Sequence, residues 1–249
     1  MRVTVITVCY NAEATIEDTI RSVLAQSYRD LEYIVVDGAS TDGTMRIIDR
    51  YRDRITRIIS EPDTGIYDAM NKGVALASGE VIGMLNADDL YLDERVVKHI
   101  VDMFEKSGSD AVFADLVYVR PGNLERVVRT YSSRAFTSTK FAYGWMPAHP
   151  TFFLKKSCYE RYGSYRTDYR IAADFELLAR MLHVHKVRYS YIPEVLVKMR
   201  MGGESTRSLK SNLILNQEIL RACRENGIRT NLLKIYSKYP KKILELFKR

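Results

Sequence analysis

Two adjacent carboxylates follow an apolar run in VIGMLNADDLYLD, residues 81–93. Val81–Leu85 has the composition of a buried strand, so Asp88 and Asp89 stand where a strand leaves the core. Like charges repel and lose solvation near a core, so we expect a positive group beside them. Paired carboxylates there suit a hard divalent cation, Mg²⁺ or Mn²⁺. The alternative is that Asp89 caps the next helix and Asp88 is solvated; we favour the cation because other strand ends are acidic too.

A further carboxylate, Asp37, ends a predicted strand in IVVDGASTDGT. An acid in this position can accept hydrogen bonds from a ribose diol or a base edge. Gly38 allows the backbone to approach a ligand closely. An ordinary turn, in which Ser40 or Asp42 caps a helix, is the alternative. Neither G-x-G-x-x-G nor G-x-x-x-x-G-K-[ST] occurs, which argues against a Rossmann dinucleotide site and a P-loop.

Two segments carry cations that can bind phosphate. SEPDTGIYDAMNKG places Asp68, Asn71 and Lys72 within one helical turn, and the Lys72 ammonium can act on a phosphate as a point charge. KMRMGGESTRS, residues 198–208, combines adjacent glycines with Arg200 and predicts a mobile loop that closes over phosphates. The alternatives are a solvated helix lysine and a plain surface turn.

A histidine and an acid in the second half complete the candidates. His149, in WMPAHPTFF, is held between an alanine and a proline among aromatics, and we weigh a metal ligand and a structural histidine equally. Asp174, in YRIAADFELLARML, lies in the first turn of a predicted helix. It can act as a general base towards a hydroxyl, or it is favourable charge at a helix N-terminus.

Apolar spacing predicts the elements that must position these side chains. Strands over 3–8, 31–36, 55–60 and 81–85 alternate with helices, which predicts a doubly wound, mostly parallel sheet. Ligands bind such sheets outside the carboxyl ends of the strands, so these acids should converge on one edge. The later elements are predicted as strands 110–118 and 124–131, an irregular stretch 132–150, a helix 171–182, an extended stretch 189–199, and helix from Leu209 that breaks at Pro240.

Composition narrows the classes of protein. The 249 residues are 46% hydrophobic and 28% charged, which is ordinary for a globular chain, and we recognise no membrane span or signal peptide. Cys9, Cys158 and Cys223 have no paired spacing, which argues against disulfides and a zinc site. Residues 1–100 carry 11 Lys/Arg against 17 Asp/Glu, whereas residues 200–249 carry 12 against 4. The basic end indicates either an anionic partner or a solvated helix face.

Three segments, taken in order, closely resemble the motifs of family 2 glycosyltransferases: ITVCYNAEATIEDTIRSVLAQSYRDLEYIVVDGASTDGT, EPDTGIYDAMNKG and GEVIGMLNADD. The resemblance covers about residues 3–90, with weaker matches to about residue 205, and is nearest to bacterial enzymes of O-antigen, capsule and colanic-acid assembly. It implies a GT-A fold and an inverting transfer of a hexosyl or N-acetylhexosaminyl group from a nucleotide-sugar, a UDP-sugar above all, with Mn²⁺ or Mg²⁺. The implied acceptor is a hydroxyl of a glycan or of an undecaprenyl-diphosphate-linked sugar.

The resemblance also assigns residues. Asn86-Ala87-Asp88 matches the D-x-D motif with Asp88 as metal ligand, His149 matches a histidine that completes the metal or diphosphate site in some members, and Asp174 matches the catalytic base. Asn86 departs from the first Asp of D-x-D, and Ala173 stands where many members have Glu. Residues expected at the nucleotide-sugar, from pattern and resemblance together, are Thr7, Tyr10, Asn11, Asp37, Gly38, Asp68, Lys72, Asn86, Ala87 and Arg200.

We expect a GT-A domain over 1–206, divided into a nucleotide-binding half (1–110) and an acceptor-binding half (111–206), with a basic helical extension over 207–249. In the tail YPKKILELFKR, apolar residues share one helical side, which suits either the inner face of the plasma membrane or packing on the body or a second copy in a homodimer. We expect a cytoplasmic protein. A sugar-phosphate nucleotidyltransferase is the second hypothesis, although ITVCYNAEAT lacks its glycine-rich basic loop. Nucleic-acid binding ranks lowest, because no aromatic and basic strand platform is present.

Overall fold

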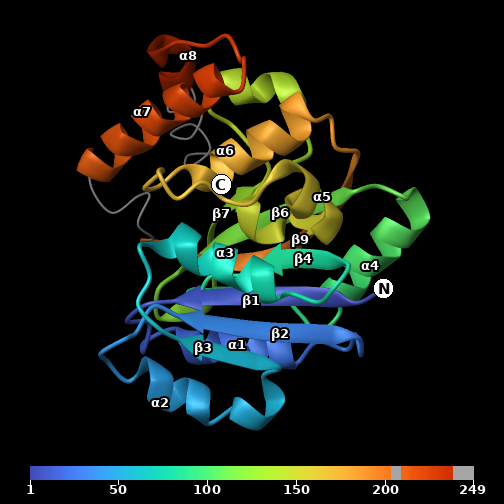
Figure 1. Ribbon diagram of the computed structural model, residues 1–249, viewed down its shortest axis with the longest axis vertical. Helices are drawn as coiled ribbons and strands as arrows, with labels where there is room; N and C mark the ends of the chain where they lie inside the picture. Colours follow the sequence, from blue (N-terminus) through green and yellow to red (C-terminus); the bar gives the residue numbers. More distant parts are fainter. Residues whose placement is uncertain (203–208, 238–249) are drawn as a thin grey trace.

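The computed structural model describes residues 1–202 and 209–237. One mixed sheet has the strand order β3-β2-β1-β4-β8-β6-β9-β5, with β7 paired to β6 (Figure 1). The strands are β1 (Val3–Cys9), β2 (Leu31–Asp37), β3 (Arg57–Ser60), β4 (Val81–Met84), β5 (Asp89–Tyr91), β6 (Ala111–Arg120), β7 (Asn123–Tyr131), β8 (Phe153–Lys155) and β9 (Tyr189–Arg200). The helices are α1 (Ile16–Leu24), α2 (Thr44–Asp49), α3 (Ile66–Leu76), α4 (Val96–Ser107), α5 (Lys156–Tyr162), α6 (Ala173–Ala179), α7 (Leu209–Glu225) and α8 (Leu232–Tyr236).

The first four strands are parallel to one another, as the alternation of strands and helices predicts. β1 and β4 are buried throughout and β2 almost throughout, because helices cover both faces of this half of the sheet. Parallel neighbours end at the same edge. The loops that follow Cys9, Asp37, Ser60 and Met84 therefore meet there, and the predicted convergence of the strand ends is confirmed.

The second half of the sheet departs from the parallel expectation. β8 is antiparallel to β4 and β6, β5 is antiparallel to β9, and β6 and β7 form an antiparallel hairpin, while β6 and β9 are parallel. The short strands β5 and β8 were not predicted, because three-residue strands display no period. The seven-residue helix α5 was not predicted either. The stretch 132–150 contains two short 3₁₀ turns, η2 (Ser138–Tyr143) and η3 (His149–Thr151). The helix predicted over 171–182 is α6 followed by a π-helical turn, Arg180–Val184.

Two hydrophobic cores lie on the two faces of the sheet. One includes α3, α6 and α7, and the other includes α1, α2 and α4. In Figure 1, α3 and α6 lie above β1 and β2, α1 overlaps the lower strands, and α2 lies below them. The three cysteines are buried and free, as expected from their spacing.

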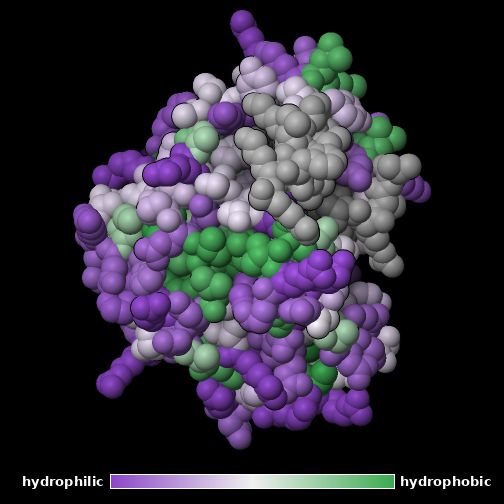
Figure 2. All heavy atoms as spheres, turned by 180° about the vertical axis from the view of Figure 1, so that it is seen from behind, coloured by the Kyte–Doolittle hydropathy of each residue, from purple (hydrophilic) through white to green (hydrophobic). Residues whose placement is uncertain are grey.

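The C-terminal helices pack onto the core beside α6. Ile219, Ala222 and Cys223 of α7 are buried, and the Cys223 thiol donates to the carbonyl of Phe141 at 3.4 Å. Leu233 of α8 is 83% exposed, and the view from behind shows hydrophobic side chains at the top of the molecule and in a band across its middle (Figure 2). Within the described ranges, none of the helices combines the length and apolar character that crossing a membrane requires. The tail YPKKILELFKR and most of the Gly-rich loop lie outside these ranges.

Gly83 in β4 has no room for a side chain. A β-carbon there would lie 2.3 Å from Cε1 of Phe153, its cross-strand partner in β8, and that ring is buried in the core. We predict that Gly83→Ala lowers the free energy of unfolding by about 1–3 kcal/mol, the usual cost of overpacking. Urea denaturation followed by circular dichroism measures this change.

Gly43→Ala is the matched control. A β-carbon at Gly43 would meet the carboxylate of Glu13, the far end of an exposed side chain that can move away. The expected change is within about 0.5 kcal/mol, as for ordinary surface substitutions. An equal loss in both variants would show that the contact with Phe153 is not the cause.

Candidate active site

Two neighbouring loops at the carboxyl edge are tied together by Asn11. Its N–H donates to the Ser40 hydroxyl at 2.8 Å, and its side-chain oxygen accepts the N–H of Thr41 at 2.9 Å. Asn11 adopts a left-handed backbone conformation (φ 48°), which asparagine tolerates better than most residues. Tyr10, just before it, is 64% exposed. The Tyr10 ring is therefore exposed to solvent at the carboxyl edge of the sheet, which we call the rim.

Asp37 is wholly buried directly beneath this rim. Its carboxylate accepts the N–H of Ser40 at 3.0 Å and the hydroxyls of Ser40 and Ser60, the latter at 2.7 Å. A β-carbon on the adjacent Gly38 would lie 2.4 Å from an oxygen of Asp63, so the Asp63 side chain would have to move. Asp37 thus fixes the two loops from within, and the side chains that border Gly38 are those of Asp63 and Tyr10.

Thr7 was expected at the nucleotide, but the structure places it in the interior. It has no exposed surface, and its hydroxyl accepts a hydrogen bond from Tyr33 at 3.1 Å. Alternation along β1 turns Thr7 towards the core that contains α1, so it does not reach the rim.

Lys72 is held over the loop that leads into α3. Its Nζ lies 2.8 Å from a carboxylate oxygen of Glu61 and donates to the carbonyl of Pro62 at 2.9 Å. Asp68, 3.9 Å from the same Nζ, accepts the N–H of Thr64 at 3.0 Å. The hydrogen bond to Glu61 raises the pKa of Lys72, so the ammonium stays charged at the edge of the sheet.

The end of β4 carries the acids noted in the sequence, and a cation does lie beside them. Arg200, at the end of β9, donates to the carbonyl of Asp88 at 2.8 Å and pairs with Asp18 of α1. Burial raises the pKa of Asp88, and Arg200 opposes that rise. Asn86 Oδ1 is buried without a partner, and Ala87 between the two is buried.

The donor set at this strand end fits a hard divalent ion in part. Asn86 and Asp88 offer an orphaned amide oxygen and a carboxylate, which are oxygen ligands of the kind that Mg²⁺ and Mn²⁺ prefer. Among the described residues, however, no group of three or more His, Cys, Asp or Glu side chains is arranged to hold a metal. An ion bound here therefore needs further oxygens from a ligand.

Asp89 begins strand β5 instead of capping a helix, so the capping alternative is wrong. It is fully buried, and neither carboxylate oxygen has a hydrogen-bond partner. Desolvation raises the pKa of Asp89 well above its ordinary value, and the neighbouring charge of Asp88 adds to the rise. Burial therefore favours the protonated form of Asp89 in the folded protein.

A cavity of about 180 Å³ contains both His149 and Asp174 in its wall. His149 is buried, its Nε2 lies 2.9 Å from the Tyr165 hydroxyl, and burial lowers its pKa to about 4. The ring is therefore neutral at physiological pH, the form that can ligate a metal or donate a hydrogen bond. Met199 also lines this cavity, and the next residue, Arg200, contacts Asp88.

Asp174 lies in the first turn of α6 with one face towards this cavity. Its Oδ1 accepts the N–H of Phe175 at 2.7 Å. Desolvation raises the pKa of Asp174 to about 6, and the negative charge of Glu218 contributes to the rise. A carboxylate with a pKa near neutrality is suited to remove a proton from a hydroxyl.

The structure thus brings together Asp174 and His149, and separately Asp88 and Arg200, with Met199 joining the two places. Sequence reasoning did not select Tyr67 or Glu218. The Tyr67 hydroxyl donates to the carbonyl of Ile171 at 2.5 Å, just before the helix that carries Asp174. A glutamate in a C-terminal helix gives no signal that it contacts residues almost fifty positions earlier.

Comparison with known proteins places these observations in a family. The model described as glycosyl transferase family 2 matches residues 4–163, more than half of the chain. An uncharacterised glycosyltransferase of Mycobacterium tuberculosis is 33% identical over 181 residues, covering 72% of this chain and 68% of the relative. A second one, named as a PGL/p-HBAD biosynthesis glycosyltransferase, is 28% identical over 85% of this chain and 79% of the relative.

Solved structures agree on the fold. The TarS 1–349 structure from S. aureus superposes with a TM-score of 0.67 at 18% identity over 89% of this chain. The present chain spans 65% of that TarS chain. A mannosyltransferase from Pyrobaculum calidifontis, solved with GDP-Man and Mn²⁺, gives a TM-score of 0.67 at 24% identity, over 90% of this chain and 63% of the other.

The buried acid Asp89 generates a stability prediction for the ligand-free protein. Because its pKa is raised on folding, the folded state keeps a proton that the unfolded state releases above about pH 4. Its contribution is fully present below the unfolded pKa and is lost as the pH rises towards the folded pKa. Asp89→Asn removes this loss, and we expect it to be more stable than the wild type at pH 8 by about 1 kcal/mol or more, and less so at pH 5.

Urea unfolding at the two pH values measures the effect. Asp102→Asn is the control, because Asp102 is exposed and pairs only with Lys98 one helical turn away. The control should follow the pH dependence of the wild type. If the free energy of unfolding of Asp89→Asn differs from that of the wild type by the same amount at both pH values, the raised pKa of Asp89 is contradicted.

Proposed function

Since this chain belongs to glycosyl transferase family 2, we propose that it transfers a sugar from a nucleotide-sugar to a hydroxyl of a glycan or lipid-linked acceptor, with inversion at the anomeric carbon. One observation carries the proposal. Asp174, with its pKa raised to about 6, shares a cavity with neutral His149 beside the end of β4. A sugar acceptor that enters this cavity meets a base of suitable strength.

Asp174 acts as the general base in this proposal. An acceptor hydroxyl is a poor nucleophile near pH 7, and the carboxylate takes its proton as the oxygen attacks C1 of the donor sugar. The bond between C1 and the diphosphate oxygen breaks on the opposite side, and its electron pair leaves with the nucleoside diphosphate. General base assistance of this kind contributes roughly 10²–10⁴-fold. In-line displacement inverts the anomeric centre.

The leaving diphosphate gains charge during this step. Lys72 and Arg200 are cations of this chain at the same edge, and both are pre-positioned by carboxylates, Glu61 and Asp18. Asp88 and Asn86 supply the protein oxygens for a divalent ion, whose chemistry when bound is to neutralise the diphosphate. Asn86 contributes an oxygen but no charge. The remaining ligands of such an ion would come from the diphosphate.

The nucleoside is expected at the loops after β1 and β2. Tyr10 offers an exposed ring for stacking on a base, and Gly38 with Asp63 borders the floor beside it. TarS has been solved with UDP and with UDP-GlcNAc, and the Pyrobaculum enzyme with GDP-Man. We propose a UDP-sugar of the hexosyl or N-acetylhexosaminyl class as the donor.

The acceptor belongs, in our proposal, to bacterial surface polysaccharide synthesis of the O-antigen, capsule or colanic-acid type. A relative named as a putative teichuronic acid biosynthesis glycosyltransferase, from Bacillus subtilis, is 40% identical over 108 residues, or 42% of this chain and 43% of its own. Leu232, Leu233 and Tyr236 of α8 are exposed and precede the basic tail in the sequence, which suits contact with a lipid surface at the inner face of the plasma membrane.

Replacing the base tests the chemistry. We predict that Asp174→Asn loses about 10²–10⁴-fold in kcat while the affinity for the donor is kept, because the amide cannot accept the proton. In the wild type, kcat/KM should rise with pH through about 6, as Asp174 loses its proton. Release of nucleoside diphosphate, measured across pH 4.5–8.5, follows both effects.

Asp168→Asn is the control for Asp174. Asp168 is half exposed, and Arg166 and Arg221 hold its pKa well below the ordinary value, so it has no proton to exchange in this range. The pH profile of kcat/KM for Asp168→Asn should keep the inflection of the wild type. Full activity of Asp174→Asn would exclude the proposed base.

A panel of nucleotide-sugars tests the donor site. We expect one UDP-sugar to raise the melting temperature, more strongly with Mn²⁺ than with EDTA, because ligand binding stabilises the folded state. Asp88→Ala should lose the part of the shift that depends on Mn²⁺ and about 10²-fold or more in kcat. Asp102→Ala, which changes an exposed acid far along α4, should behave as the wild type.

Equal shifts with Mn²⁺ and EDTA in the wild type would remove the ion from the proposal. Pyrophosphate release from a nucleoside triphosphate and a sugar phosphate would instead support nucleotidyl transfer.

A further inference from the structure

A single carboxylate from the C-terminal helix binds the backbone that leads into the catalytic helix. Glu218 of α7 accepts the N–H of Arg170 at 2.7 Å on one oxygen, and the N–H groups of Ile171 and Ala172, each at 2.9 Å, on the other. Ala172 is the residue before α6, and Asp174 follows two positions later. These N–H groups come from outside the helical ladder, so Glu218 supplies the acceptor that this turn otherwise lacks.

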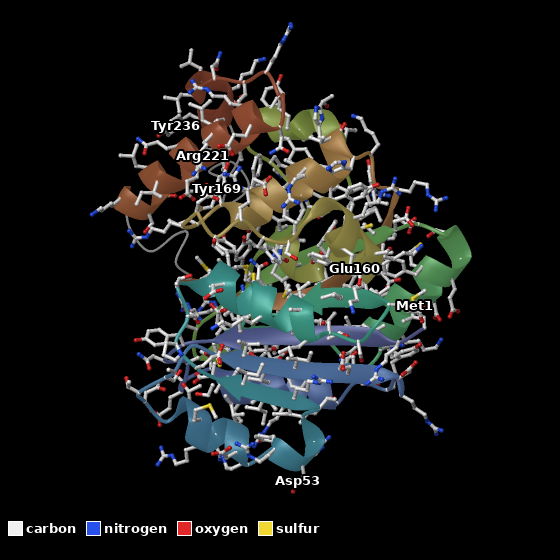
Figure 3. The ribbon with its side chains drawn as sticks, in the orientation of Figure 1. Met1, Asp53, Glu160, Tyr169, Arg221 and Tyr236 are labelled. Atoms are coloured by element: carbon white, nitrogen blue, oxygen red, sulfur yellow. The ribbon has the colours of Figure 1, made fainter. Side chains whose placement is uncertain are left out.

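The contact is part of a continuous face of α7. Glu218, Arg221 and Glu225 lie three and four residues apart, so they point to the same side of the helix. Arg221 pairs with Asp168 and stacks on the Tyr169 ring, 4.4 Å from its centroid, and Glu225 accepts from the Tyr169 hydroxyl and pairs with Arg166. Figure 3 shows Tyr169 and Arg221 side by side where α7 meets the segment before α6.

Within this face, only Glu218 reaches the turn itself. The segment also separates two cavities: Arg170 and Glu218 line one of about 270 Å³, while Ile171 and Asp174 line the one of about 180 Å³. The Tyr67 hydroxyl, which lines the same larger cavity as Glu218, donates to the carbonyl of Ile171. Both the N–H groups and a carbonyl of this turn are therefore bonded by side chains, and the N–H groups depend on Glu218.

We infer that Glu218 is a positioning residue for the transfer reaction: its carboxylate fixes the turn 170–172, from which the helix that carries Asp174 begins. This inference rests on the proposed role of Asp174 as the base. Glu218 binds main-chain N–H groups and occupies neither oxygen of Asp174. Its negative charge destabilises a second negative charge nearby, which strengthens Asp174 as a proton acceptor.

Other groups face Asp174, and they do not titrate in the same range. Burial raises the pKa of three tyrosines above the ordinary value: Tyr67 of α3, Tyr118 of β6, and Tyr165 in the segment between α5 and α6. His149 of η3 has a pKa lowered to about 4. Tyr131 of β7 is the remaining ionisable side chain in the cavity wall. A change between pH 5 and 7 in the acidic limb of the pH profile of kcat/KM therefore reports the ionisation of Asp174.

Glu218→Gln tests both parts of the inference. The amide keeps one acceptor oxygen but loses the charge, so we expect kcat to fall about tenfold and the inflection of kcat/KM to move to lower pH. Glu218→Asp keeps the charge on a shorter stem, so kcat should fall while the inflection stays. A purely structural role would lower kcat in both variants without moving the inflection in either.

Amide hydrogen exchange, read by mass spectrometry, gives a measurement that does not depend on activity. Peptides that cover residues 170–172 should exchange about tenfold faster or more in Glu218→Gln than in the wild type. Glu225→Gln is the matched control, since it breaks contacts of the same helix face to Arg166 and Tyr169 but none to residues 170–172. Exchange at 170–172 and the pH inflection should both remain as in the wild type.

The outcomes separate this inference from the proposed function. If Asp174→Asn is inactive but Glu218→Gln keeps the wild-type inflection and exchange, the role of Glu218 is wrong and the base stands. If Asp174→Asn is fully active, the proposed function fails whatever Glu218 does. If Glu218→Gln does not fold, hydrogen exchange in Glu218→Asp decides: exchange at residues 170–172 that stays at the wild-type rate overturns the inference, and faster exchange confined to these residues, with a lower kcat, supports it.

Discussion

A carboxylate removed from water must be hydrogen-bonded, paired with a cation or protonated, and this requirement gives the acids at the carboxyl edge of the sheet different states. Asp37 is satisfied by Ser40 and Ser60 and acts inside the loops. The carboxylate oxygens of Asp89 have no hydrogen-bond partner, and burial raises its pKa well above the ordinary value. Asp174 lies between these extremes, with one N–H bond and a pKa raised to about 6. Only the intermediate state combines a free oxygen with sufficient basicity.

The same requirement explains why support for Asp174 comes through the backbone. Direct hydrogen bonds to its two oxygens would stabilise the carboxylate and lower its basicity. Glu218 bonds the main chain of residues 170–172, whereas the Tyr67 hydroxyl donates to the carbonyl of Ile171 and also lowers the pKa of Asp174. A helix late in the chain is thereby connected to the turn before α6, and in our proposal this makes α7 part of the site as well as of the core.

The sequence predicts what depends on period and on strand ends. The long buried strands β1, β2 and β4 and their acids are recognisable because every residue of a two-sided strand is apolar and the loop begins where that run stops. Partners far along the chain leave no local pattern. The burial of Asp37 and Thr7, the bonds of Glu218 and the strand β5 at Asp89 all depend on tertiary neighbours. Residue types thus predict where the site lies, and burial decides which of its acids can react.

Charge asymmetry between the two ends of the chain has a use inside the fold. The first hundred residues are acidic and residues 200–249 are basic, a balance that in isolation indicates either an anionic partner or a solvated helix face. Arg200, however, pairs with Asp18 and donates to the Asp88 carbonyl, which holds the end of β9 against the acidic strand ends of the first half. Arg221 pairs with Asp168 in the segment that precedes α6. Both cations therefore form ion pairs within the fold, and Arg200 finds its counter-charge in the acidic first half of the chain.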